Sequence, residues 1–233
     1  MKINRVNKLY ILIFLILATL AVIKTVRLKP WDRYYYFVSA TSPASYPIHV
    51  RNLYMETDNP DDLIIINIEN TAPYAANWGE EYYFVEANDK EQLPKQLMIQ
   101  YLDFRSKLFY KDTLALPTDQ IRKIFKDAAK KNEELDIYYR GGDAKGLTFL
   151  IGIANQGHII VWLRTKNEDH VVLKTKLTPK QPTPEDLYYD GYKSFNEYYK
   201  AVFADISDSL KLKIDSGWDD NAKYIDSLQI PKP

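Results

Sequence analysis

An uncharged stretch near the N-terminus restricts what this chain can fold into more than any other feature. Residues 9–23 are fifteen positions without a charged side chain, and only Tyr10 and Thr19 among them carry a polar atom. As a helix this stretch is about 22 Å long, and its continuation to residue 26 reaches about 27 Å, close to the thickness of a bilayer's hydrocarbon core. Lys24 would then extend its ammonium group toward the lipid headgroups. The stretch is typical of a helix in contact with lipid.

Three interpretations of this stretch stay open on the sequence alone. A buried helix of a soluble domain is disfavoured, because such helices normally keep a polar face. Three basic side chains precede the stretch, as in the charged start of an export signal. A cleaved signal peptide needs small residues at alternate positions before the cut, and residues 18–21 lack that pattern. We therefore predict that residues 1–29 form an uncleaved signal anchor, which crosses the membrane through residues 9–26.

The orientation of this anchor is not decided by its flanking charges, since basic residues lie on both sides of the stretch. The short N-terminal tail and the absence of cysteine both favour export of the chain that follows. We therefore expect residues 30–233, the body of the protein, to lie outside the cytoplasmic membrane.

The body is mildly acidic. Residues 1–29 hold six of the 31 basic side chains and no acidic one, which leaves 25 basic against 31 acidic side chains in the body. A nucleic-acid partner is disfavoured, because phosphate binding needs a concentrated positive face. The lack of cysteine excludes disulfides, thiol catalysis, zinc–thiolate sites and lipid attachment to an N-terminal cysteine. Roughly 200 residues are the size of one domain, so we predict a single extracytoplasmic domain over residues 30–233.

Short apolar segments with strand-like character dominate the body. They lie in residues 31–37, 48–55, 63–68, 97–102, 108–116, 147–154, 159–163 and 170–176. Two segments have helical spacing instead. One follows Pro117, with Thr118 as its predicted cap and with Ile121, Ile124, Phe125 and Ala128 at helical spacing. The other runs from Ser194 to Ile206, with Ser194 and Glu197 as a predicted capping box. Because neighbouring strands have short links, we predict an α+β fold with a mainly antiparallel sheet and two inserted helices.

Two glycine-containing links are interpreted as turns. Residues 155–157, Asn-Gln-Gly, join two apolar segments, and we expect the glycine to adopt a positive φ. Gly141 and Gly142, with Gly146 nearby, lack the spacing of a dinucleotide-binding loop, so we interpret them as a flexible turn.

The order of several motifs resembles a known family. After an aromatic-rich first strand come the segments at residues 46–50 (YPIHV), 93–101 (LPKQLMIQY), 107–110 (KLFY), 116–117 (LP) and 150–163 (LIGIANQGHIIVWL). This succession, over roughly residues 31–200, resembles DUF2931, a bacterial family of uncharacterised envelope proteins. The glycine turn that leads into Val-Trp-Leu is its most specific part.

The resemblance implies a location rather than a reaction, because no reaction is assigned to the family. It implies an envelope location. Together with the predicted anchor and its orientation, we expect a single-pass protein of the bacterial inner membrane, with its C-terminal domain in the periplasm. Many members resemble lipoproteins with a cysteine after the signal sequence, whereas this chain has none, so its attachment has to be the helix itself. Some small envelope proteins of this kind are immunity proteins against secreted antibacterial effectors, and that role is a hypothesis for this chain.

The sequence contains no motif that indicates catalysis or a cofactor. His49, His158 and His170 lack the spacing of a helical zinc pair, and His158 follows a turn, where we expect it to face solvent. The acidic turn at residues 58–62 is interrupted by Pro60 and lacks the closing glutamate of a calcium loop. We therefore predict no catalytic residue, no metal ligand and no cofactor site.

Tyrosine is unusually frequent, with 19 residues, many of them adjacent in sequence. In a strand, adjacent side chains point to opposite faces, so one tyrosine of a pair can pack while the other meets solvent or a partner. Tyrosine suits interfaces because it offers apolar area and a hydroxyl group at low entropic cost. The alternative is that these residues line the sheet faces. As candidate partner-binding residues we select Tyr138, Tyr139, Tyr188, Tyr189 and Tyr192.

These observations favour a membrane-anchored envelope protein that binds a protein partner and is not an enzyme. An immunity or inhibitor role against a secreted effector is the specific form of this prediction. Two alternatives stay open: an envelope hydrolase with a site assembled from dispersed histidine, serine and acidic residues, and a structural component of the envelope.

Overall fold

The structure is a computed structural model, and it describes residues 4–58, 63–66, 71–72, 78–81, 87, 89–188 and 191–226. The chain forms two compact units, Met1–Arg33 and Tyr34–Pro233. Part of the predicted acidic turn and the end of the predicted strand at residues 63–68 lie outside the described residues, as does Tyr189.

The first unit is an apolar helix followed by a short 3-10 turn, η1 (Pro30–Asp32). Helix α1, Arg5–Leu28, begins at Asn4, whose side chain accepts a hydrogen bond from the amide of Val6, and ends at Lys29 in the left-handed conformation. Its two threonine hydroxyl groups donate to main-chain carbonyls four residues earlier. The helix therefore satisfies its own polar groups, and it is long and apolar enough for a membrane anchor or a signal sequence.

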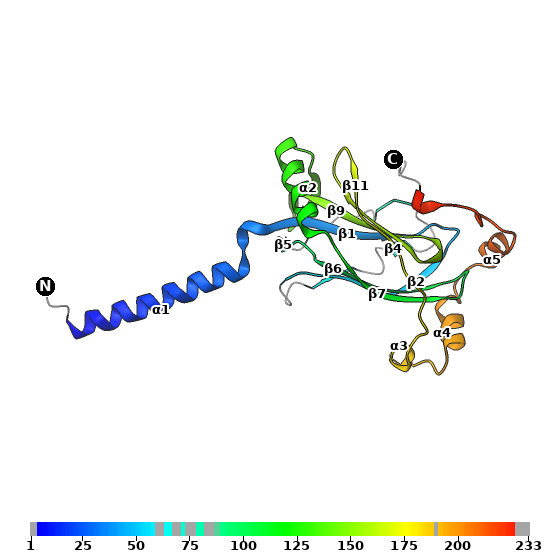
Figure 1. The fold of residues 1–233 in the computed structure, drawn as a ribbon, viewed down its shortest axis with the longest axis horizontal. Helices are drawn as coiled ribbons and strands as arrows, with labels where there is room; N and C mark the ends of the chain where they lie inside the picture. Colours follow the sequence, from blue (N-terminus) through cyan, green and yellow to red (C-terminus); the bar gives the residue numbers. More distant parts are fainter. Residues whose placement is uncertain are drawn as a thin grey trace. The chain divides into compact units, whose positions relative to one another are not determined.

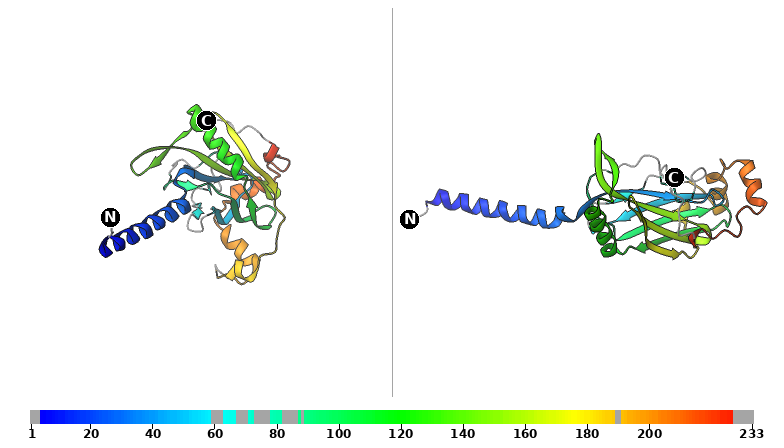
Figure 2. Two further views of the ribbon diagram at one scale, coloured as in Figure 1. Left: turned by 60° about the vertical axis from the view of Figure 1, so that its left-hand side comes forward. Right: turned by 90° about the horizontal axis from the view of Figure 1, so that it is seen from above.

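The second unit is built around two β-sheets (Figures 1 and 2). The larger sheet has the order β11-β10-β9-β1-β4, with β5 beside β1 and β8 beside β9, and the smaller sheet has the order β3-β2-β6-β7. The larger sheet consists of β1 (Arg33–Thr41), β4 (Thr71–Ala72), β5 (Glu91–Gln92), β8 (Leu135–Tyr139), β9 (Gly142–Ile153), β10 (His158–Arg164) and β11 (Asp169–Lys176). The smaller sheet consists of β2 (Ile48–Glu56), β3 (Ile64–Ile65), β6 (Gln96–Asp103) and β7 (Phe109–Ala115).

Among the described strand pairs, the parallel ones involve β1. This strand runs parallel to β4 and to β9, where the register extends from Tyr35 opposite Gly146 to Thr41 opposite Gly152. The predicted α+β class, dominated by strands, is confirmed, but the parallel pair was not predicted. A parallel partner needs a long crossover, and here the whole smaller sheet and α2 (Thr118–Lys131) lie between the two strands in sequence. The prediction of an antiparallel sheet was based on short links between strands that are neighbours in sequence. Such links give no information on a pair of strands that are far apart in sequence.

The core lies between the two sheets, which face each other in Figure 1. In β2 the side chains of Ile48, Val50, Leu53 and Met55 are all buried, although strict alternation would turn Leu53 away from the core. A β-bulge between Val50 and Asn52 shifts the register and restores the inward direction. The bulge lets one strand supply four core residues despite the break in alternation.

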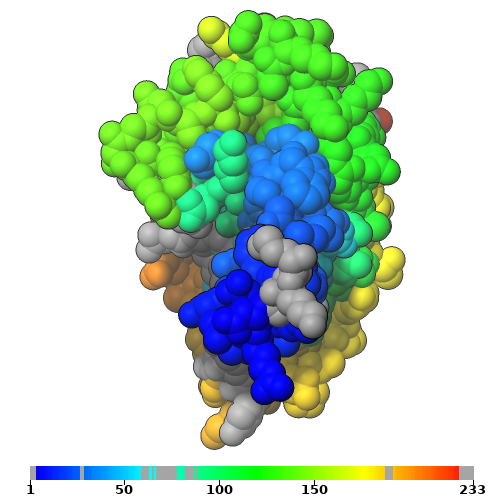
Figure 3. All heavy atoms as spheres, turned by 90° about the vertical axis from the view of Figure 1, so that its left-hand side faces the viewer, coloured from blue at the N-terminus to red at the C-terminus, as the bar shows by residue number. Residues whose placement is uncertain are grey.

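Helix α2 packs against the core at the end where β1 begins. Ile121, Phe125 and Ala128 are buried, as their helical spacing predicted. The ring centroid of Phe125 lies 4.9 Å from that of Tyr34 and 6.2 Å from that of Phe149. Figure 3 looks onto this end, where α2 and the hairpin of β8 and β9 lie beside the start of β1.

Local contacts changed two predicted boundaries. The prediction that Thr118 caps α2 is wrong, because Pro117 holds the N-cap position and the hydroxyl of Thr118 donates to the carbonyl of Pro94 (3.0 Å). The first strand is also longer at its C-terminal end than the predicted segment at residues 31–37. Strand β1 continues through Thr41, since the ladder to β9 satisfies its main-chain groups there.

The body contains four α-helices in its described part, where the sequence predicted two. They are α2, α3 (Pro184–Tyr188), α4 (Phe195–Val202) and α5 (Asp208–Asp215). Ser194 caps α4 by accepting from the amide of Glu197 (3.2 Å), as predicted. The predicted helix to Ile206 breaks after α4, and Ser207 caps α5. The helical spacing of apolar residues continues past this break, because Phe203 and Ile206 still pack with α4 against the smaller sheet. The spacing therefore does not indicate where the helix ends.

The hairpin of β8 and β9 contains two positions that favour glycine, Gly141 and Gly146. Arg140 and Gly141 form its turn, and both have positive φ (47° and 87°), as a type I′ turn requires. The predicted flexible turn at Gly141 and Gly142 is therefore an ordered hairpin. Further along β9, a Cβ atom on Gly146 would lie 2.2 Å from the carbonyl oxygen of Tyr35. The parallel pairing of β1 and β9 thus requires glycine at this position.

We expect Gly146→Ala to destabilise the body by roughly 2–3 kcal/mol, because the added methyl group forces β1 and β9 apart. Urea denaturation of the full chain in detergent measures this change. Gly142→Ala is the matched control, since the nearest atom to a Cβ there is 4.0 Å away. Equal stability of the two variants would contradict the close approach of the strands.

Candidate functional site

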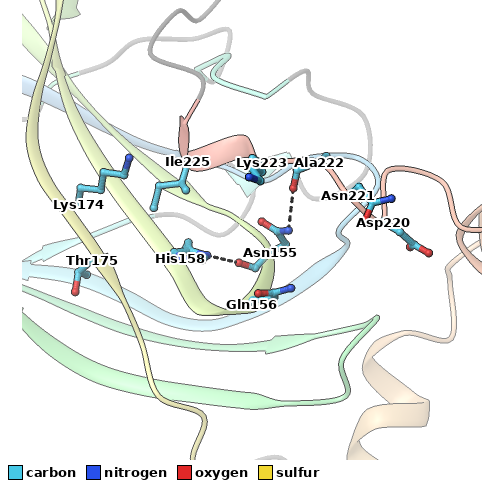
Figure 4. Close-up of a pocket in the computed structure, with 10 residues that line it drawn as sticks. All are labelled: Asn155, Gln156, His158, Lys174, Thr175, Asp220, Asn221, Ala222, Lys223 and Ile225. Carbon is cyan, nitrogen blue, oxygen red and sulfur yellow. Dashed lines mark hydrogen bonds between the residues drawn. The ribbon is translucent and has the colours of Figure 1, made fainter.

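The C-terminal part of the chain closes the end of the second unit that lies opposite α2 (Figures 1 and 2). After α5 the chain returns across the end of the larger sheet and forms the 3-10 helix η4 (Tyr224–Asp226), near the turn η3 (Asn155–Gly157) (Figure 4). We call residues 218–225 the C-terminal strap. Irregular backbone leaves main-chain groups that need partners, and side chains from the two sheets and their turns supply them.

Arg105 is positioned by the turn between β6 and β7. Asp103, at the end of β6, accepts hydrogen bonds from the amide of Arg105 (2.8 Å) and the hydroxyl of Ser106 (2.9 Å). Burial raises the pKa of the Asp103 carboxyl above its ordinary value, although the hydrogen bonds from Ser106 and Arg105 oppose this shift. These bonds fix the turn and direct the Arg105 side chain to the strap.

The guanidinium group of Arg105 binds several groups at once. Its Nη1 donates to the carbonyls of Ser45 (3.1 Å) and Trp218 (2.7 Å), and its Nη2 pairs with the carboxylate of Asp220. It also lies 4.5 Å from the ring centroid of Tyr46. Because the Arg105 side chain is only 12% exposed, its charge-assisted hydrogen bonds to the two carbonyls are largely shielded from water, whereas the side chain of Asp220 is 56% exposed.

Other side chains hold the strap further along its length. Tyr46 donates to the carbonyl of Asp219 (3.0 Å), and Nδ2 of Asn155 donates to the carbonyl of Ala222 (3.1 Å). Within the strap, Tyr224 donates to the carboxylate of Asp219 (2.6 Å). Burial, together with this hydrogen bond, raises the pKa of Tyr224 to about 12, so its hydroxyl stays a donor far above neutral pH.

A cleft of about 540 Å³ lies between the strap and the neighbouring strands (Figure 4). Its walls come from three segments: η3 with the start of β10, the C-terminal end of β11, and the strap. The volume falls within the usual range of ligand sites. Its polar lining includes Asn155, His158, Lys174, Asp220, Asn221 and Lys223.

His158 lines this cleft, whereas the sequence predicted that it faces solvent. Its Nδ1 lies 3.0 Å from the carbonyl oxygen of Asn155. A carbonyl oxygen can only accept, so Nδ1 carries the hydrogen in this contact. The carboxylate of Asp220, in the opposite wall, is paired with Arg105. His158 is therefore hydrogen-bonded to Asn155, and Asp220 forms an ion pair with Arg105.

The other two histidines lie outside this cleft. The ring of His49 is 5.9 Å from that of Tyr198, and Nε2 of His170 is 3.7 Å from the carboxylate of Glu168. Over the part of the chain that the structure describes, no group of three or more histidine, aspartate or glutamate side chains is placed to hold a metal ion.

The five tyrosines predicted as a contact surface fall into two separate groups. Tyr138 and Tyr139 lie on β8, near the start of β1, and Tyr138 is 39% exposed. The ring of Tyr139 is 5.0 Å from that of Tyr35, and its hydroxyl donates to the carboxylate of Asp89. This hydrogen bond raises the pKa of Tyr139 to about 12. Tyr139 is therefore engaged in contacts within the fold.

The second group of tyrosines belongs to α3 and the start of α4. Tyr188 ends α3, but its side chain lies outside the described residues, as does all of Tyr189. Tyr192 is half-buried, and its ring is 5.4 Å from that of Tyr198, which packs against the smaller sheet. Neither Tyr192 nor the two tyrosines of β8 line the cleft.

Asp186 attaches α3 to the outer face of the smaller sheet. Its carboxylate accepts hydrogen bonds from Gln100 (2.9 Å), Lys111 (2.8 Å), and both the amide and the hydroxyl of Thr183 (2.8 Å each). The residue is 5% exposed. Burial by itself raises the pKa of Asp186, but the hydrogen bonds from Lys111 and Thr183 outweigh it and lower the pKa below its ordinary value.

Comparison with known proteins places this architecture in a sequence family. The family model described as a protein of unknown function, DUF2931, matches residues 24–217. No curated protein and no solved structure matches the chain. The match covers both sheets and ends directly before the strap, so the cleft has walls from inside and outside the matched range.

We expect Arg105→Met to release the strap, because it removes the charge-assisted hydrogen bonds that hold Trp218 and Asp220. The loss is about 2–3 kcal/mol, which raises the rate of tryptic cleavage after Lys223 roughly 30- to 150-fold. Arg122→Met on α2 is the control, since Arg122 does not contact the strap. Unchanged cleavage in Arg105→Met would contradict the role of Arg105.

We expect Asp186→Asn to lower the free energy of unfolding by about 1–3 kcal/mol at pH 7, because Lys111 loses its charged partner. The folded pKa of Asp186 is lowered, so its stabilisation is present above the ordinary carboxyl pKa and is lost as the pH falls through the folded pKa. The difference from the unmodified protein should therefore shrink at pH 3. Urea denaturation at both pH values measures it, with Asp119→Asn on the exposed side of α2 as the control.

Proposed function

The chain belongs to the DUF2931 family, and we propose that this member is a membrane-anchored envelope protein that binds a protein partner and is not an enzyme. The single observation that carries the proposal is the cleft beside the strap, whose walls come from three segments of the chain. An immunity or inhibitor role against a secreted effector is the specific form of this proposal.

The proposed anchor is helix α1. Its apolar side chains are exposed along the whole helix, and its two threonine hydroxyl groups are bonded to its own carbonyls. Both features suit a hydrocarbon environment, where an unpaired polar group is costly. With the N-terminal tail in the cytoplasm, the body lies in the periplasm of a bacterial cell.

Within the body, the cleft is remote from the start of β1. The nine residues of this strand extend for about 30 Å. The strap and the cleft lie at the far end of this strand, next to Ser45 and Tyr46.

The chemistry of the cleft favours binding. Its lining includes amide and ammonium groups of Gln156, Asn221 and Lys223, while Asp220, the acidic side chain among its described lining residues, is paired with Arg105. Donors fixed in a concave surface recognise carbonyl and carboxylate groups of a partner. The tight attachment of the strap keeps this wall in place before the partner arrives.

One observation favours the second candidate, an envelope hydrolase. His158 lines the cleft together with the hydroxyl of Thr175 and the carboxylate of Asp220, which are the residue types of a hydrolytic site. His158→Gln separates the two candidates, because glutamine can donate to the carbonyl of Asn155 but cannot transfer a proton. Binding would persist in this variant, whereas hydrolysis would be lost.

We expect the full chain, purified from its own membranes in mild detergent after crosslinking, to carry one protein partner in stoichiometric amount. Ala222→Trp fills the cleft and should lower recovery of this partner at least tenfold. Ala129→Trp, on the exposed face of α2, is the matched control and should leave recovery unchanged. Recovery without any partner, or equal loss in both variants, would reject the proposal.

A further inference from the structure

Helix α2 presents a basic face to solvent. Lys123, Lys126 and Lys130 are all exposed, and their spacing by three and four residues puts them on one side of the helix. The buried side chains of α2, among them Phe125, lie on the opposite side. We call the three residues the lysine face of α2. It takes no part in the packing of the core and is open to a partner.

Neighbouring acids do not neutralise the lysine face. Among the described residues, no carboxylate pairs with Lys123, Lys126 or Lys130. Asp119, four residues before Lys123, pairs with Arg122 instead (2.5 Å), and Asp127 is half-buried. The helix as a whole holds five of the body's 25 basic side chains but only two of its 31 acidic ones. An anionic surface therefore attracts α2 and repels the rest of the body.

The length of the chain keeps α2 within reach of the membrane in which α1 is proposed to lie. Helix α1 ends at Leu28, and Tyr34 is the first residue of the second unit. The residues between them extend for at most about 20 Å. The ring centroid of Tyr34 lies 4.9 Å from that of Phe125, so α2 packs directly on the residue that this link reaches. The argument needs only this covalent link and no fixed arrangement of the two units.

The link also carries a side chain that favours the membrane–water interface. Trp31 lies in η1 and is 66% exposed. Tryptophan is enriched at the level of the lipid headgroups, where its ring meets apolar surface and its N–H meets water. With Trp31 at this level, Tyr34 follows within about 10 Å. The lysine face can then reach the headgroups.

We infer that the lysine face of α2 binds the anionic headgroups of the phospholipid membrane that holds α1. The inference rests on the proposed anchor and adds the class of lipid that the body recognises. The ammonium groups of the three lysines donate to phosphate oxygens, and the attraction acts within a Debye length of about 8 Å. Within the body the cleft lies at the end opposite α2, so this contact turns the cleft away from the bilayer.

The test uses the full chain in nanodiscs, with a single cysteine introduced by Ala129→Cys at an exposed position of α2 and labelled with bimane. Because the chain has no cysteine of its own, the label is unique. Phosphatidylcholine with a nitroxide on its headgroup, in the same proportion in every disc, quenches bimane at short range. We expect roughly threefold stronger quenching in discs of equimolar phosphatidylcholine and phosphatidylglycerol than in discs of phosphatidylcholine alone. About 0.5 M sodium chloride should remove the difference.

Three variants separate the lysine face from charge in general. Lys123→Gln/Lys126→Gln/Lys130→Gln should abolish the dependence on phosphatidylglycerol, whereas replacement of the same lysines by arginine should retain it. The matched control, Lys176→Gln/Lys193→Gln/Lys200→Gln, removes the same charge from exposed positions elsewhere in the body and should behave like the unmodified chain. Bimane on Ala201→Cys, in α4, should be quenched equally in both kinds of disc.

Equal quenching at residue 129 in both kinds of disc, or unchanged quenching in the glutamine variant of the lysine face, would overturn the inference. Loss of the protein partner in that variant with unchanged quenching would also overturn it, because the lysine face would then bind the partner. A chain that does not enter the discs would refute the proposed anchor itself. If the chain enters the discs and keeps its partner but shows no dependence on phosphatidylglycerol, the proposed function stands and only the lipid contact is wrong.

Discussion

The parallel pairing of β1 with β9 determines the layout of the body. Because the two strands run in the same direction, residues 42–47 after β1 emerge at the same end as η3 after β9. That end receives Ser45 and Tyr46, which then meet Arg105 and the strap. An antiparallel partner in place of β9 would put η3 at the opposite end of the sheet, where β1 begins. The position of the cleft therefore depends on a pairing that only Gly146 permits.

Arg105 holds the strap against the end of the body where the cleft lies. Its guanidinium group joins three segments that are remote in sequence, and Asp103 fixes its direction from within the same turn. A buried arginine without such partners would destabilise the fold. Here its donors bind the carbonyls of Ser45 and Trp218 and the carboxylate of Asp220. Trp218 lies outside the strands, so no ladder satisfies its carbonyl. The polar contacts that stabilise the strap also define one wall of the cleft.

Much of the fold could be predicted from the sequence, because strands and helices leave a local pattern. The spacing of Ile121, Phe125 and Ala128 predicted a buried helical face, and the turn before His158 was recognised from its glycine. The cleft could not be predicted from the sequence. Arg105 and Asp220 are 115 positions apart. Several other contacts are made to main-chain carbonyl groups, which every residue has and which therefore leave no pattern in the sequence. The tyrosine surface stays a prediction, but Tyr139 and Tyr192 turned out to have ring contacts within the fold.

The strap follows directly after the range that matches the family, yet the side chains that hold it lie inside that range. Arg105, Tyr46 and Asn155 bind its main-chain carbonyls, and these contacts do not depend on which side chains the strap carries, whereas the ion pair between Arg105 and Asp220 does. The side chains that face the cleft from the strap, such as Lys223, are free to differ without loss of these anchoring contacts. The strap is thus attached largely through its main chain, while several of its side chains line the cleft.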